Sequence, residues 1–221
     1  MTDKHELDQL IARSEAFEDE LFGLFEDSSF SSDHKSTAVL AMCNIALEHA
    51  NSLRELIRIG LPTSAMGMLR LQYEAVVRAI WVLYAASDNA VAKLVAPLTP
   101  ETAQAASNSL PAFSVMLKEI EQKGPPGVHR LLNEFKDYSW RPLNSFVHGG
   151  IHAVSRHREG YPVGLLAQAT RQSNNLVHMS AMALAFHLND GGVLMSVVAI
   201  HTKHADCLQL KSPGEPIAPV N

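Results

Sequence analysis

An arginine and a histidine stand seven residues apart in the segment 141–154, whose sequence is RPLNSFVHGGIHAV. At about 100° per residue in a helix, Arg141 and His148 share one face with Ser145 and His152. An imidazole with a pKa of about 6.5 can give or take a proton at neutral pH. A guanidinium stays charged and binds phosphate oxygens in a forked geometry. This pair could therefore cut a phosphodiester by acid–base catalysis without a metal.

The opposite face of the same segment predicts how the pair is held. Pro142 suits the first position of a helix, where its missing N–H costs nothing. We expect one helix over 141–154 whose apolar arc is buried in a core: Leu143, Phe146, Val147, Ile151 and Val154. Asn144 and Ser145 lie beside the pair and could bind a phosphate or orient the histidine. The alternative interpretation is a polar outer face that contacts only water.

Two glycines, Gly149 and Gly150, fall in the middle of this expected helix. Each costs about 1 kcal/mol there relative to alanine, so something should be gained in return. We expect either a neighbouring helix packed very close to the backbone, or a ligand or partner chain beside His148.

A second constellation stands in an earlier apolar helix expected over 64–86. Arg70, Glu74 and Arg78 are spaced four apart and form a charged seam. One interpretation is a ladder of ion pairs partly buried between helices. The other is that Glu74 faces the late helix and orients Arg141 or His148, while Arg70 or Arg78 contacts phosphate.

The order of the helices, the segment LRLQYEAVVRAIW and the later RPLNSFVHGG together resemble the HEPN superfamily of small α-helical bundles. Its motif is Arg-x(4–6)-His near the start of a late helix, and Arg141-x6-His148 matches its upper length. The resemblance implies a metal-independent endoribonuclease, with His148 in proton transfer and Arg141 on the phosphate. The 2′-hydroxyl attacks and leaves a cyclic phosphate. Many catalytic members carry a polar residue directly after the arginine, where this chain has Pro142.

The resemblance also implies partners. Such members usually form homodimers in which two motifs line one cleft, act on RNA, and often pair with a cognate antitoxin in toxin–antitoxin or anti-phage systems. The alternative function is a non-enzymatic helical interaction or nucleotide-binding protein that acts as a dimer. No phosphate-binding loop, dinucleotide motif or catalytic elbow is present, so we expect no cofactor.

Other histidines give weaker signals. His148 and His152 have a metal-ligand spacing, but no carboxylate motif accompanies them, so we expect no metal site. His201, His204 and Cys207 spread around the last expected helix, and we interpret that helix as a solvated one. We interpret His178 and His187, on an alanine- and methionine-rich helix, as packed, hydrogen-bonded residues.

Composition predicts the fold class. Hydrophobic residues make up 47% of 221, and apolar positions recur at helical spacing with no alternating strand-like run. We expect one all-α domain, an antiparallel helical bundle over 1–210. Its parts are an acidic helix in 1–27, a core bundle over 36–190 and a last helix over 193–210, followed by a disordered tail over 211–221.

Charge is distributed unevenly along the chain. The first 27 residues carry nine acidic and two basic side chains, a net charge of −7. The whole chain has −5, which leaves +2 for the other 194 residues. An anionic substrate is therefore admissible at the body of the protein. We expect no membrane span, no signal peptide and no disulfide between Cys43 and Cys207. These expectations together predict a cytoplasmic location.

Overall fold

The computed structural model describes residues 2–97, 99 and 110–208, and no strand occurs in that part of the chain. Its helices are α1 (Thr2–Gly23), α2 (His34–Arg58), α3 (Pro62–Tyr84), α4 (Asp88–Val95), α6 (Phe113–Lys123), α7 (Pro126–Val147), α8 (Ile151–Glu159), α9 (Val163–Leu188) and α10 (Gly191–Lys203), followed by a short 3-10 turn, Ala205–Cys207. The all-α bundle predicted from periodicity is confirmed. The expected tail over 211–221 lies outside the described residues.

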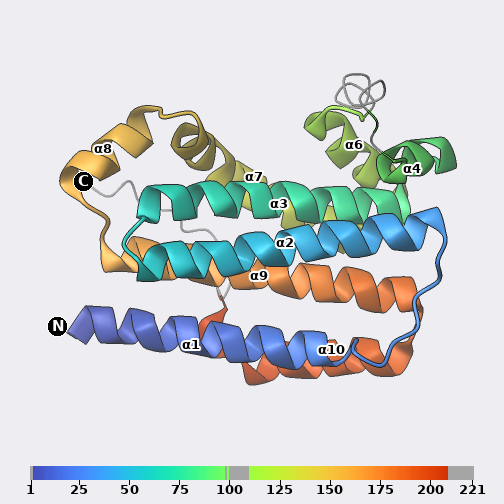
Figure 1. Cartoon of the computed structure of the whole chain (residues 1–221), viewed down its shortest axis with the longest axis horizontal. Helices are drawn as coiled ribbons and strands as arrows, with labels where there is room; N and C mark the ends of the chain where they lie inside the picture. The colour runs from blue at the N-terminus through green and yellow to red at the C-terminus, as the bar shows by residue number, and fades with distance from the viewer. Residues whose placement is uncertain (1, 98, 100–109, 209–221) are drawn as a thin grey trace.

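The long helices pack side by side around α3. Figure 1 shows α3, α2, α9 and α1 stacked in this order, with α10 beside α1 and with α4 and α6 grouped at one end. Helix α3 contacts α2, α6, α7 and α9. Most of its side chains are buried, including Trp81 and Tyr73. Helix α7, which carries Arg141, is therefore held against the most buried element of the fold.

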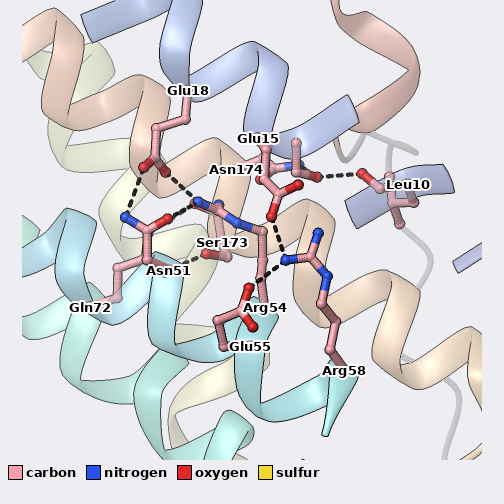
Figure 2. A network of polar contacts seen from close by, with 11 residues as sticks. Leu10, Glu15, Glu18, Asn51, Arg54, Glu55, Arg58, Gln72, Ser173 and Asn174 are labelled. Atoms are coloured by element: carbon pink, nitrogen blue, oxygen red, sulfur yellow. Dashed lines mark hydrogen bonds and ion pairs between the residues drawn. The ribbon is translucent and has the colours of Figure 1, made fainter. Parts of the chain in front are cut away.

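Charged side chains join α1 to α2 (Figure 2). The Glu18 carboxylate accepts hydrogen bonds from Arg54 Nη2 at 2.8 Å and from Asn51 Nδ2 at 3.0 Å. Arg54 is only 1% exposed, so this pair is buried. At the edge of the same interface Arg58 pairs with Glu15 at 2.6 Å. Part of the acidity of the first segment therefore neutralises arginines of α2.

Amide side chains connect α9 to α3 and to α1 (Figure 2). Gln72 of α3 donates to the Ser173 carbonyl at 3.0 Å, and the Ser173 hydroxyl donates back to Gln72 Oε1 at 2.7 Å. On the other side Asn174 donates to the Ser14 hydroxyl of α1 at 2.8 Å. Because buried polar groups need partners, these bonds favour one relative placement of the three helices.

Candidate functional site

Helix α7 places Arg141 and His148 at its exposed end. His148 is the C-cap residue of α7, and both side chains are exposed. Two helical turns separate them along one face. Among the described residues, neither side chain forms a hydrogen bond or ion pair, so both are free to meet a ligand. The opposite face of α7 is anchored in the core, where the Tyr73 hydroxyl donates to the Leu132 carbonyl at 2.7 Å.

The single helix predicted over 141–154 is wrong. One helix, α7, runs from residue 126 to 147, so Pro142 lies inside it and not at its first position. There the proline cannot donate to the carbonyl of Tyr138, four residues earlier. The chain then turns at Gly149 and Gly150 and begins α8 at Ile151.

The glycines serve this turn, which corrects the expectation of close helix packing. Gly149 has φ +63°, a left-handed conformation that glycine adopts without strain. The Gly150 N–H donates to the Ser145 carbonyl at 2.7 Å, which is the six-to-one bond of a Schellman C-cap. A Cβ on Gly150 would lie 2.6 Å from Ser145 Oγ. The segment HGG therefore ends one helix and redirects the chain into the next.

The turn also exposes most of the predicted apolar arc. Leu143 is buried and Phe146 is half-buried, as expected. Val147, Ile151 and Val154 are 43%, 80% and 54% exposed, so their predicted burial is wrong. The periodicity had assumed a continuous helix, and the turn gives α8 a new direction.

Ser145 and its neighbours hold the turn. The Ser145 hydroxyl accepts a hydrogen bond from the His152 backbone N–H at 3.0 Å and so caps the start of α8. The Asn144 carbonyl accepts from the His148 N–H at 3.1 Å. The His152 ring is exposed, and its centroid lies 6.5 Å from that of Phe146. Ser145 is thus a positioning residue for the corner that carries both histidines.

The seam of Arg70, Glu74 and Arg78 is a partly buried ion-pair ladder between α3 and α7. Glu74 pairs with Arg70 and, at 3.0 Å, with Arg78. The Arg70 guanidinium also lies 3.3 Å from the centre of the Trp140 ring on α7, a cation–π contact. Burial, together with the charge of Arg78, lowers the pKa of Arg70 to about 10, which leaves it charged at neutral pH.

The contact between Arg70 and Trp140 joins the seam to α7. Within the described part of the chain, no contact joins Glu74, Arg70 or Arg78 to Arg141 or His148. The arrangement matches the structural interpretation of the seam. The interpretation in which Glu74 orients the Arg141–His148 pair stays a prediction.

Two other histidines, His187 and His178, are packed between helices. His187 hydrogen-bonds the Ser36 hydroxyl at 2.7 Å, which confirms its interpretation as a packed, bonded residue. His178 of α9 lies against His201 of α10, with ring centroids 4.3 Å apart. Burial and the neighbouring His201 lower the pKa of His178 to about 3.

His204 and Cys207, which follow the last helix, are buried and not solvated, which corrects the sequence interpretation for these two residues. His204 is 7% exposed and pairs with Glu20 at 2.8 Å, and Cys207 is fully buried. Salt bridges and packing against α1, which no spacing rule in α10 could reveal, account for the difference. Among the described residues, no group of three or more histidine, cysteine or carboxylate side chains could hold a metal ion.

Comparison with known proteins gives a family but no activity. The family model described as "Family of unknown function (DUF6988)" matches residues 43–210, most of the chain. The chain belongs to DUF6988. The matched range includes α3, α7 and α8, and with them every residue of the candidate site. No curated protein and no solved structure matches the chain. No described helix is both long and apolar enough to cross a membrane.

Proposed function

We propose that this chain is an HEPN-like, metal-independent endoribonuclease. The observation that carries the proposal is the free pair on α7: Arg141 and His148, exposed, unpaired within the described structure and two turns apart on one face. The last turn of α8 carries three further basic side chains, Arg156, His157 and Arg158. An anionic polymer is the substrate class that this charge suits.

The chemistry follows from the two side chains. Neutral His148 takes the proton of a ribose 2′-hydroxyl while the 2′-oxygen attacks phosphorus. The bond from phosphorus to the 5′-oxygen breaks, and the leaving oxygen needs a proton. In a homodimer with two motifs facing one cleft, the partner subunit's His148 supplies that proton. Arg141 stabilises the extra negative charge on the phosphate. The products are a 2′,3′-cyclic phosphate and a 5′-hydroxyl.

Matched substitutions test the assignment. His148→Ala should lower the rate of RNA cleavage by about 10²–10⁴-fold, the usual contribution of a general acid or base. His152→Ala removes an exposed histidine one turn away on α8 and serves as its control. Arg141→Ala is compared with Arg158→Ala in the same way. Equal loss in both members of a pair would indicate general charge binding and contradict the proposed roles.

A specific observation favours a second candidate, a non-enzymatic interaction protein. Val147, Ile151 and Val154 are exposed aliphatic side chains at the end of α7 and on α8. Exposed apolar side chains of this kind suit contact with a second protein chain, either another copy or an antitoxin-like partner. Under this candidate Ile151→Glu disrupts the complex in light scattering, whereas His148→Ala leaves the complex intact and no RNA is cleaved.

A further inference from the structure

A small recess opens between α3, α7 and α9, next to the candidate site. Its volume is about 80 Å³, several times the roughly 10–15 Å³ that one water molecule needs. The wall is almost entirely apolar and one side is open to solvent. We call it the Tyr138 recess, and the residues used below are Met66, Tyr138, Ser139, Pro142, Gln168 and Ala169.

Polar groups in this wall lack partners. The Ser139 hydroxyl is buried and forms no hydrogen bond within the described residues, although its side chain is only 4% exposed. A buried hydroxyl without a partner is uncommon because it loses its bonds to water. The carbonyl of Tyr138 lacks the usual donor four residues later, because residue 142 is proline. The Ser139 hydroxyl is therefore a buried, unpaired polar group beside an otherwise apolar wall.

An aromatic ring and a cation stand at the open side. Tyr138 lines the recess and is 45% exposed, so its ring is available for stacking. Arg141 lies one helical turn further along α7, exposed and without an ion-pair partner among the described residues. Apolar walls, a buried unpaired hydroxyl, an aromatic ring and a nearby guanidinium are together what a nucleotide requires.

We infer that the Tyr138 recess binds a nucleobase of the RNA whose phosphate lies on Arg141. The base inserts its edge toward Ser139 and stacks on Tyr138, and Gln168 contributes a side-chain amide at the wall. This inference rests on the proposed function for its choice of RNA as the ligand. It adds a specificity subsite to the candidate site. This subsite is formed by residues other than Arg141 and His148.

Nucleotide titration tests the subsite directly. The probes are the four ribonucleoside 3′-monophosphates and the matching nucleosides. Binding is monitored through the NMR signal of the Met66 methyl group in the recess wall. We expect at least one base to shift this signal. Arg141→Gln should weaken nucleotide binding and leave nucleoside binding unchanged, because only the nucleotide carries a phosphate.

Filling the recess should remove binding. Ala169→Leu places three extra carbons in the wall and should raise the dissociation constant at least about tenfold. Ala199→Leu adds the same carbons on the exposed face of α10 and is the control. Tyr138→Ala, at a half-exposed position, is the second variant should Ala169→Leu fail to fold. An unmoved Met66 signal, or wild-type affinity in these recess variants, overturns the subsite.

Failure of the subsite and failure of the proposed function are distinguishable. Nucleotide binding in the recess without any RNA cleavage overturns the ribonuclease and leaves the subsite standing. Cleavage that depends on His148, at an unchanged rate and with unchanged base preference in Ala169→Leu and Tyr138→Ala, overturns the subsite and leaves the ribonuclease standing.

Discussion

At the scale of single residues, the corner between α7 and α8 depends on one hydroxyl. Ser145 accepts from the His152 N–H at 3.0 Å, and its carbonyl accepts from the Gly150 N–H at 2.7 Å. The side chain and the backbone of one serine thus fix both helix ends, and through them the positions of His148 and His152. His148 and His152 therefore share one anchor.

Substitutions at this corner should be coupled. Gly150→Ala places a Cβ 2.6 Å from Ser145 Oγ and should lower the free energy of unfolding by about 1–3 kcal/mol. Ser145→Ala should cost about 1 kcal/mol through the lost helix cap. In the double variant the clash is relieved, so urea denaturation should show a cost smaller than the sum of the two. Strict additivity would contradict the contact.

Glu74 is the second residue with a measurable role. Glu74→Ala leaves Arg70 and Arg78 without their shared partner at a partly buried interface, and we expect a loss of about 3 kcal/mol in unfolding free energy. Glu55→Ala is the control, because Arg58 retains Glu15 and the pair is exposed. That change should cost less than about 1 kcal/mol. Similar losses of unfolding free energy in the two variants would show that the seam is solvent-exposed.

At the scale of elements, the direction of α8 determines what the corner exposes. Ile151→Ser should change the free energy of unfolding by less than about 0.5 kcal/mol, because Ile151 is 80% exposed. Leu143→Ala, eight residues earlier and 4% exposed, should cost about 2–5 kcal/mol. Chemical denaturation of the two variants compares them. A large loss of unfolding free energy in Ile151→Ser would contradict the exposed position and support the continuous buried face that periodicity predicted.

The interface between α9 and α10 should make the fold sensitive to acid. The pKa of His178 is lowered to about 3 by burial and by His201, whose own pKa burial also lowers. Between pH 6.5 and 3 the unfolded chain therefore binds a proton that folded His178 does not bind. Stability should fall by up to about 1.4 kcal/mol for each pH unit in that range, and be unaffected by this group above it.

Removing the imidazole isolates this effect from the carboxylates. His178→Gln should flatten the decline of unfolding free energy between pH 6.5 and 4, measured by urea denaturation at several pH values. His5→Gln, at an exposed position of α1, is the control and should leave the decline unchanged. The same slope in wild type and His178→Gln would show that the pair is accessible to protons in the folded state.

At the scale of the whole molecule, α3 packs against α2, α6, α7 and α9, and α9 in turn packs against α1 and α10. The two tryptophans, Trp81 and Trp140, report the region of α3, α6 and α7, whereas far-ultraviolet circular dichroism reports all helices. A single domain predicts one cooperative transition with the same midpoint by both methods. Separate midpoints would divide the chain into two folding units.

Sequence reasoning reached the fold class because helical periodicity of apolar residues is a local signal. The helix expected over 64–86 is α3, Pro62–Tyr84, within two residues at each end. Sequence reasoning missed the corner between α7 and α8 for two reasons. It placed Pro142 at the start of a helix although Pro142 lies inside one, and it placed Gly149 and Gly150 in the middle of a helix although they follow its end. A Schellman turn requires the glycines just after a helix, and HGG followed by Ile-His is that signal.

The sequence could predict only the part of the candidate site that lies on a single helix. The spacing of Arg141 and His148 holds in the structure because Arg141 lies in α7 and His148 is the C-cap residue of the same helix. The Tyr138 recess and the His178–His201 contact join residues about 20 to 100 positions apart on different helices. Such contacts depend on how helices pack, which one sequence does not specify. The cation–π contact between Arg70 and Trp140 was missed for the same reason.

The most direct test of the central claim is the chemical nature of the ends left on a cleaved RNA. Purified protein and a labelled RNA are incubated with a metal chelator, and the new termini are identified by mass spectrometry. The account predicts 2′,3′-cyclic phosphate and 5′-hydroxyl ends from the wild type and from His152→Ala, and no new ends from His148→Ala. New 3′-hydroxyl and 5′-phosphate ends, or the same cyclic ends from His148→Ala, would contradict it.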